Sequence, residues 1–321
     1  MAPSVFVTRP LPDPGVGVLR DAGLEVTVNP EDRPLTADEL RAGVADADAL
    51  LCTLSDRIDG DLLDRAPRLR VVANFAVGYD NIDVAGARAR GVEVTTTPGV
   101  LTDATADLTW ALLLAAARNV GPGERLVRSG EWSGWSPTQL LGQPVRGRRL
   151  GIFGMGAIGR AVARRARGFD MEVVYHNRHR VPPEVEAELG ATYVSTDELL
   201  RTSDFVSLNA PLNDESRHVL DRAAFERMKP TAIVVNTGRG ALIDEAVLVE
   251  VLREGRIAAA ALDVYEFEPK ITEGLAALDN VVLIPHLGSA AVDARADMVN
   301  LCSRNIIEVL AGRPAVTPAP G

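Results

Sequence analysis

The segment Gly154-Met155-Gly156-Ala157-Ile158-Gly159 lies between a strand-like apolar run at 150–153 and a helix-like run at 160–167. A GxGxxG spacing is a weak signal alone, but a strand before it and a helix after it are the context of a dinucleotide-binding loop. The first glycine permits the tight turn, the second lets the backbone approach a pyrophosphate, and the third allows close helix–strand packing. The start of the helix adds free N–H groups and a partial positive charge. We expect all six residues to bind a dinucleotide; the alternative is a glycine-rich turn without a ligand.

The strand expected next, at 172–175, ends without the carboxylate that usually holds the ribose hydroxyls about 20 residues after such a loop. It is followed by His176-Asn177-Arg178-His179-Arg180. Neutral Asn177 does not repel a 2′-phosphate, and Arg178 and Arg180 add charge-assisted donors worth about 1.5–3 kcal/mol each. We therefore expect NADP(H) to be preferred and NAD(H) to be possible, unless these arginines belong only to a solvated loop. The two histidines have no third ligand nearby, so no metal site is expected.

Apolar runs alternate with helix-like runs along most of the chain. Strands are expected at 4–8, 25–28, 49–53, 70–73, 92–95, 150–153, 172–175, 192–194, 205–208, 232–235, 258–262 and 281–284. Helices are expected between and after them, among others at 59–65, 80–90, 102–118 and 290–310, and after a capping aspartate, Asp244. Glycine and proline argue against a long regular element at 121–147, and the Pro-rich tail 312–321 is expected to be irregular or disordered at its end.

This alternation predicts an α/β fold with parallel sheets covered by helices. A chain of 321 residues is longer than one hydrophobic core usually serves. We therefore expect two domains. One comprises residues 1–98 with 289–321, because the final helix returns to the first domain, and the other comprises residues 99–288 and carries the glycine-rich loop.

The composition, with 46 % hydrophobic and 24 % charged residues, is that of a soluble globular enzyme. A net charge of −10 argues against nonspecific nucleic-acid binding, because no broad basic surface neutralises phosphates. Cys52 and Cys302 are expected to be inert thiols in a reducing compartment. The N-terminus shows no charged leader followed by an apolar stretch, and the longest apolar run, 110–117, is too short to span a bilayer. We expect a cytoplasmic protein without nucleic-acid or membrane partners.

Three charged residues follow successive expected strands of the second domain. Arg239, Glu268 and His286 come after the strands at 232–235, 258–262 and 281–284. Taken singly, each would more often be a surface charge or a structural residue. Ligands of open α/β sheets, however, bind beyond the carboxyl ends of the strands. Together, at matching strand ends of a domain with a dinucleotide loop, the three residues indicate an active site.

The chemistry of these three residues fits the reduction of a carbonyl group. Hydride arriving at a keto carbon leaves negative charge on oxygen, and a protonated His286 can donate the proton. Glu268 can orient the imidazole and favour its protonated form. Arg239 can hold a substrate carboxylate and polarise the carbonyl. His218 lies outside this set, and we interpret it as structural or solvated.

Several long strings carry a family resemblance. They are NFAVGYDNID at 74–83, LTDATADL at 101–108, the glycine-rich loop, and the segments around Arg239, Glu268 and His286. On these strings the sequence resembles the D-isomer-specific 2-hydroxyacid dehydrogenases over nearly its whole length, and within that family the glyoxylate/hydroxypyruvate reductases. The resemblance implies a flavodoxin-like substrate domain, a Rossmann-type cofactor domain and a cleft between them. It also implies hydride transfer between a nicotinamide dinucleotide, which the residues after the strand at 172–175 indicate to be NADP(H), and a small 2-keto or 2-hydroxy acid.

The resemblance assigns roles to particular positions. It implies that Arg239 contacts the substrate carboxylate and keto oxygen, that His286 is the acid/base and that Glu268 hydrogen-bonds to it. Backbone N–H groups of Val77 and Gly78 would contact the carboxylate. Further positions implied are Leu54 at the substrate, and Thr237 and Asp263 at the cofactor.

Family members are usually homodimers, so the resemblance also implies a homodimer. The stretch 130–135 is similar to a dimerisation loop, from which Trp135 would reach the partner's active site; alternatively, Trp135 packs within its own subunit. Two other functions stay open. One is a relative acting on another 2-keto acid, and the other is a nicotinamide-sensing binding protein that acts through a partner surface.

Overall fold

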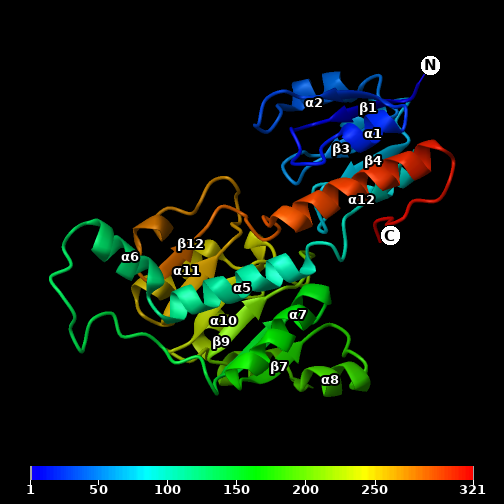
Figure 1. The fold of residues 1–321 in the computed structure, drawn as a ribbon. Helices are drawn as coiled ribbons and strands as arrows, with labels where there is room; N and C mark the ends of the chain where they lie inside the picture. The colour runs from blue at the N-terminus through cyan, green and yellow to red at the C-terminus, as the bar shows by residue number, and fades with distance from the viewer. Residues whose placement is uncertain (1, 321) are drawn as a thin grey trace. The chain divides into compact units, whose positions relative to one another are not determined.

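The computed structural model describes residues 2–320, which form two compact units (Figure 1). One unit extends to Leu101 and includes the chain from Ser289 onward, and the other is Thr102–Gly288. The expected boundaries, after residues 98 and 288, lie close to these. Each unit is built on its own parallel sheet, so the chain is α/β as predicted.

The first unit has five parallel strands in the order β2-β1-β3-β4-β5. This is the flavodoxin-like order, in which the chain reverses direction across the sheet between β1 and β3. Every residue of β3 and β4 is buried, because helices cover both faces of a parallel sheet. The strands are β1 Ser4–Val7, β2 Glu25–Val28, β3 Ala49–Cys52, β4 Val71–Asn74 and β5 Glu93–Thr95. The helices are α1 Gly17–Asp21, α2 Ala37–Val44, α3 Gly60–Asp64, α4 Val84–Ala89 and α12 Val292–Leu310.

The second unit has seven parallel strands in the order β12-β11-β10-β9-β6-β7-β8. Because β6 pairs with both β7 and β9, the sheet reverses there, as in a Rossmann-type fold. The strands are β6 Arg149–Phe153, β7 Glu172–His176, β8 Ala191–Tyr193, β9 Phe205–Leu208, β10 Ile233–Asn236, β11 Ala259–Leu262 and β12 Val281–Leu283. The helices are α5 Thr102–Ala117, α6 Val120–Arg128, α7 Ala157–Ala166, α8 Pro183–Leu189, α9 Thr196–Thr202, α10 Arg222–Arg227 and α11 Glu245–Arg253, with short 3₁₀ turns η1 Arg167–Phe169, η2 Gly240–Leu242 and η3 Leu275–Ala277.

The seven-stranded sheet separates two hydrophobic cores. Alternate residues of β6 point to opposite faces, so Ile152 packs in the core under α5 and α7 while Phe153 packs in the core under α9, α10 and α11. Trp110 of α5 fixes the first layer: its indole donates to the Val162 carbonyl at 3.1 Å and its ring stacks on Phe169. This alanine- and leucine-rich helix is buried on several faces.

Local side-chain caps set several helix starts. Asp244 accepts from the Val247 backbone N–H, so α11 begins where the sequence predicts it. Asp83 caps α4 in the same way through Gly86, and the helix expected at 80–90 therefore begins only at Val84.

One prediction about the loops was wrong. The stretch expected to lack a long regular element begins with the nine-residue helix α6. Its third residue, Pro122, is tolerated because the first N–H groups of a helix have no partner within the helix; the first bond is donated by Gly123 to the Asn119 carbonyl. Glycine and proline in the first turn of a helix are therefore weaker evidence against that helix than we assumed from the sequence.

The Pro-rich tail is irregular, as predicted, but hydrogen bonds hold it in place as far as Ala319. The Ala319 N–H donates to the Val94 carbonyl at 2.8 Å, and the Thr317 hydroxyl donates to the Thr96 carbonyl at 2.7 Å. Ala319 itself is buried. The expectation of disorder at its very end falls on residue 321, outside the described residues. Among the helices of residues 2–320, none has the length and apolar character needed to cross a membrane.

Candidate active site

The glycine-rich loop has the backbone that the sequence predicts. Gly154 has φ +93°, and a Cβ there would lie 2.5 Å from the Ala210 nitrogen. A Cβ on Gly159 would lie 2.1 Å from the Gly154 carbonyl oxygen, so the helix packs too closely for any side chain. A Cβ on Gly156, by contrast, would meet no atom within 4 Å. Only this middle glycine faces open space, as close approach of a ligand to the backbone requires.

The helix after the loop begins earlier than expected. It starts at Ala157 with Gly156 at the N-cap position, so Ile158 and Gly159 form its first turn. No side chain caps it, which leaves its first N–H groups to a ligand. Met155 is buried in the core, and its N–H donates to the Asn177 side-chain oxygen at 2.6 Å. The residues present fit the pyrophosphate of a dinucleotide, with Asn177 fixing the loop from the end of β7.

The two arginines after β7 lie in different surroundings. Arg178 has a side chain that is 67 % exposed, and its contact with Glu215 is 3.5 Å long. Arg180 instead makes a two-point ion pair with Glu186, at 2.8 and 2.7 Å, above the ring of Tyr193. Arg178 is therefore the more accessible of the two for a phosphate.

His176, the first residue of the same run, contacts neighbouring residues of the second unit. His176 Nδ1 lies 2.9 Å from the Val194 carbonyl oxygen, and the ring stacks on Tyr193. Within residues 2–320, no cluster of three or more His, Cys, Asp or Glu side chains has a geometry that could hold a metal ion.

The loops after β10, β11 and β12 bring the three predicted charged residues to one edge of the sheet. His286 Nδ1 lies 2.9 Å from Glu268 Oε2, while Glu268 Oε1 accepts from the Tyr265 N–H at 3.0 Å. Burial raises the pKa of Glu268, but the hydrogen bond and charge of His286, the Tyr265 N–H and the charge of Arg239 outweigh it and leave this pKa below its usual value. Glu268 is thus a carboxylate at neutral pH and can only accept, so Nδ1 of His286 carries the proton and Nε2 is left for a substrate.

Arg239 is placed by a fully buried asparagine. The Asn236 side-chain amide donates to the Arg239 carbonyl at 2.8 Å, and its oxygen accepts from the Gly238 N–H at 3.1 Å. The guanidinium donates to the Gly238 carbonyl at 3.0 Å. Thr237, expected at the cofactor, shares a 2.8 Å hydroxyl contact with Thr109 of α5. The segment Thr237–Arg239 is thus held from both sides.

Asp263 has a structural role that was not expected from the sequence. It is fully buried, and its two carboxylate oxygens accept the N–H groups of Leu287 and Gly288. Its carbonyl accepts the N–H of His286, whose φ of +52° is unusual for a residue with a side chain. Burial raises the pKa of Asp263 against the lowering effect of these N–H groups. Asp263 therefore fixes the turn that carries His286, and contact with a nicotinamide carboxamide stays a prediction.

His218 has a definite partner. Its Nε2 lies 2.6 Å from Oε1 of Glu266, which belongs to the same loop as Glu268. The Glu266 side chain is only 8 % exposed, and Arg217 approaches the same oxygen at 3.5 Å. Of the two interpretations of His218, structural or solvated, the geometry supports the structural one.

The first unit carries the remaining expected substrate residues. In the loop after β4, buried Asn74 donates to the Gly78 carbonyl at 2.8 Å and closes the turn. Val77 is exposed, and in the part of the chain that the structure describes no protein acceptor is seen for the N–H of Val77 or Gly78. Leu54 follows β3 and is half-buried.

Trp135 lies in the loop after α6 and is 83 % exposed. Packing within its own subunit, the alternative to a role at a dimer interface, is therefore not seen. Cys52 and Cys302 are buried, and burial raises the pKa of each thiol, as expected for inert cysteines.

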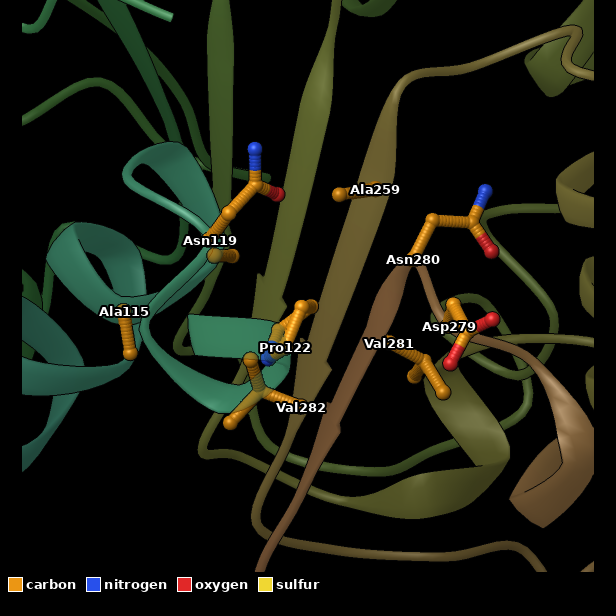
Figure 2. Close-up of a pocket in the computed structure, with 9 residues that line it drawn as sticks. Ala115, Asn119, Pro122, Ala259, Asp279, Asn280, Val281 and Val282 are labelled. Atoms are coloured by element: carbon orange, nitrogen blue, oxygen red, sulfur yellow. The ribbon is translucent and has the colours of Figure 1, made fainter. Parts of the chain in front are cut away.

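Two hollows of the second unit lie at the opposite edge of its sheet. One, about 10 Å³ in volume, lies where β11 and β12 begin, between Asn119 and Pro122 on one side and Asp279 and Asn280 on the other (Figure 2). A larger, open groove of about 490 Å³ shares these four residues. Because the strands are parallel, their starts lie away from the ends that carry Glu268 and His286, and neither hollow belongs to the candidate active site.

Comparison with known proteins places the chain in a family. Residues 110–288 match the family model of the D-isomer specific 2-hydroxyacid dehydrogenase, NAD binding domain. A glyoxylate reductase of Thermococcus kodakarensis is 51 % identical over 311 residues, which are 96 % of this chain and 93 % of the relative.

Solved structures agree with this. A protein from Thermus thermophilus has a TM-score of 0.93 at 46 % identity, with 99 % of this chain and 100 % of that one covered. An NADPH-dependent glyoxylate/hydroxypyruvate reductase from Sinorhizobium meliloti, in complex with NADP and malonate, has a TM-score of 0.85 at 34 % identity, with 99 % and 97 % covered. The chain belongs to the D-isomer specific 2-hydroxyacid dehydrogenase family.

Proposed function

We propose that this enzyme reduces glyoxylate and hydroxypyruvate to the corresponding 2-hydroxy acids and prefers NADPH. The observation that supports this most is the Glu268–His286 pair, 2.9 Å apart, at the sheet edge that also carries Arg239. Relatives of about half-identical sequence are glyoxylate reductases, and one solved structure of the family is an NADPH-dependent reductase with NADP bound.

The residues divide the reduction between them. The dinucleotide supplies the hydride that C2 of the keto acid receives. Arg239 binds the substrate carboxylate and draws electron density toward the keto oxygen. His286 gives its Nε2 proton to that oxygen, so that hydride and proton together turn the keto group into a hydroxyl. Glu268 stays ionised, accepts from Nδ1 and stabilises the imidazolium before the transfer.

Other positions complete the proposed binding sites. At the cofactor these are Gly154–Gly159, Asn177, Arg178, Thr237 and Asp263, with Arg180 in a lesser role because it is paired with Glu186. At the substrate they are Leu54, Val77 and Gly78 of the first unit, the last two through their N–H groups.

The preference for NADPH is supported by the end of β7. No carboxylate occupies 176–180, so nothing there repels a 2′-phosphate. Exposed Arg178 provides a donor at the same place. One charge-assisted hydrogen bond of about 1.5–3 kcal/mol would give roughly ten- to hundredfold selectivity.

We also propose that the enzyme is a homodimer in the cytoplasm. Exposed apolar side chains gather on α6 and the loop that follows it: Val120, Val127, Trp132, Trp135 and Leu141. Exposed apolar patches on soluble proteins commonly mark protein interfaces. In the dimer, Trp135 would reach the partner's active site. The two buried free thiols suit a reducing compartment. Light scattering of the purified chain tests the dimer, and a monomer at micromolar concentration would contradict it.

Initial rates of NADPH oxidation with glyoxylate, repeated with NADH at equal concentrations, test the reaction and the cofactor together. We expect rapid turnover and a higher kcat/KM for NADPH. A higher kcat/KM for NADH would overturn the cofactor preference. Absence of turnover with glyoxylate and hydroxypyruvate, but turnover with a bulkier 2-keto acid, would overturn the proposed substrate.

A further inference from the structure

A buried carboxylate holds the loop that carries Glu268. Glu245 is the first residue of α11, and it is 1 % exposed. Its Oε1 accepts the N–H of Glu266 at 2.6 Å, and its Oε2 accepts the hydroxyl of Thr272 at 2.7 Å. These two donors lie on either side of Glu268 along the chain. One side chain therefore ties down the loop both before and after the residue that contacts His286.

Burial of this carboxylate calls for an explanation. A buried carboxylate is costly unless it is hydrogen-bonded. Among residues 2–320, Glu245 accepts hydrogen bonds from two neutral donors, both in the Glu268 loop, so it holds that loop and forms no ion pair there.

The neighbouring backbone leaves the loop little space. A Cβ on Gly240 would lie 1.8 Å from the carbonyl carbon of Tyr265, so the Arg239 loop lies directly against the Glu268 loop. His218 holds the Glu266 side chain from outside. After Glu268 in the chain, the side chain of Thr272 donates its hydrogen bond to Glu245. Thr272 lies in the segment 270–274, to which the family resemblance gives no role.

We propose that Glu245 is a positioning residue of this enzyme: it fixes the segment between Tyr265 and Thr272 so that Glu268 stays in hydrogen-bond contact with His286. The inference rests on the proposed function, in which His286 donates the proton. Other ionisable groups act on the pair from neighbouring elements, Arg239 from the end of β10 and Asp263 and Tyr265 from the same loop. Arg239 and Asp263 are held by hydrogen bonds that do not involve Glu245, so the effect of Glu245 can be measured separately from theirs.

The test compares four variants of the full-length enzyme. Glu245→Ala removes both hydrogen bonds. Glu245→Gln keeps them, because its oxygen can accept from the Glu266 N–H and its amide can donate to the Thr272 oxygen. Thr272→Val removes one bond with little change of shape. Glu250→Gln is the matched control, since Glu250 lies on the same helix with a half-exposed side chain paired to Arg222.

Two measurements report on positioning rather than on folding alone. The first is amide hydrogen exchange at Glu266, which we expect to be at least about tenfold faster in Glu245→Ala. The second is the pH dependence of kcat for glyoxylate reduction. In Glu245→Ala we expect kcat to fall roughly ten- to hundredfold and its alkaline decline to begin about one pH unit lower, since His286 loses the support of Glu268. The KM for glyoxylate should change less than kcat.

The remaining variants sharpen the result. Glu245→Gln and Glu250→Gln should stay close to the wild-type profile, and Thr272→Val should lie between Glu245→Ala and the wild type. A Glu245→Ala enzyme with wild-type exchange at Glu266 or a wild-type pH profile overturns the proposal. So does Glu245→Gln if it is as impaired as Glu245→Ala, since charge rather than position would then matter.

The proposal can also be tested if the Glu245→Ala variant does not fold or if the wild-type enzyme reduces no keto acid. If Glu245→Ala does not fold, Thr272→Val decides through the same two measurements. If the wild-type enzyme reduces no keto acid, the proposed function fails, but exchange at Glu266 still shows whether Glu245 holds the loop.

Discussion

The loop after β11 carries two glutamates, each of which contacts a histidine from another part of the second unit, and the surroundings of the two pairs differ. Glu268 lies 2.9 Å from Nδ1 of His286, whereas Glu266, two residues earlier, lies 2.6 Å from Nε2 of His218. Both histidines have φ near +52°. The Glu268 side chain is 36 % exposed and that of Glu266 only 8 %. The two histidines are similarly exposed, at 31 % for His286 and 35 % for His218, so the first pair is the more open one only at its carboxylate. The carboxylate of the second pair is buried and is also approached by Arg217.

In the proposed function only one of these two carboxylate–imidazole contacts belongs to an acid/base. Among the described residues Nε2 of His286 has no hydrogen-bond partner, whereas Nε2 of His218 contacts Glu266. The two arginines after β7 differ in a similar way. Arg178 is exposed and has one long contact, with Glu215, whereas Arg180 forms two hydrogen bonds with Glu186. In each case the residue with an unused hydrogen-bonding group is the one we assign to chemistry or binding.

The largest expected effect comes from the two histidines. Asparagine is a suitable replacement for both, because it tolerates positive φ but cannot transfer a proton at neutral pH. We expect His286→Asn to lower kcat about 100- to 10,000-fold, and His218→Asn to lower it less than about fivefold. Steady-state reduction of glyoxylate measures both. Equal losses in the two variants would remove the distinction between the pairs, and near-normal turnover of His286→Asn would disprove the acid/base assignment.

Substitutions of the two glutamates should give the next largest difference in kcat. Gln at 268 still accepts from Nδ1 of His286 but has no charge, so we expect kcat to fall roughly ten- to hundredfold, whereas Glu266→Gln should retain most activity.

The pH dependence gives Glu268→Gln a second signature. Because the pKa of Glu268 lies below its ordinary value of 4.5, its contribution to stability and activity is present above that pH and is lost as pH falls through the lowered pKa. Glu268→Gln should lack this acid-side loss, and its activity should decline earlier on the alkaline side. Profiles of kcat against pH for both variants check this; an unchanged profile for Glu268→Gln would contradict the pairing.

The two arginines should show the same contrast in binding. We expect Arg178→Ala to reduce the preference for NADPH over NADH about tenfold or more, by removing one charge-assisted hydrogen bond to the 2′-phosphate. Arg180→Ala should change it only about two- to threefold, because its guanidinium is occupied by Glu186. The ratio of kcat/KM for the two cofactors in each variant is the measurement. A larger effect at Arg180 would show that its ion pair opens to the cofactor.

Much of this arrangement follows from local sequence. The glycine-rich loop, the strands and the Asp244 cap depend on residues within a few positions of each other, so their patterns are visible in the sequence. Arg239, Glu268 and His286 could be grouped because parallel strands bring their carboxyl ends to one edge of the sheet. The helix at Val120–Arg128 was missed for a local reason, since Pro122 was treated as a breaker although it lies in the first turn.

The supporting contacts could not be predicted in this way. His218 and Glu266 are 48 residues apart, and Glu245 and Glu266 are 21 apart. Asp263 reaches the N–H groups of the His286 turn from a neighbouring strand, 24 and 25 residues away. Such contacts depend on the detailed packing of loops, and no residue spacing indicates them. Hence the sequence predicted which charged residues come together at the sheet edge, but not which residues hold them in place.

The smallest expected effect is on stability, and it reverses the order of the pairs. Glu266 is buried, so Glu266→Gln or His218→Asn weakens a charge-assisted bond worth about 1.5–3 kcal/mol. For a chain of this size such a loss lowers the apparent melting temperature by about 2–4 °C. His286→Asn should shift it less, because the pair of His286 with Glu268 is partly solvated. Thermal melts of the three variants decide the matter: if His286→Asn were the least stable, the open pair would also be holding the fold together, and the separation of a chemical pair from a structural one would be wrong.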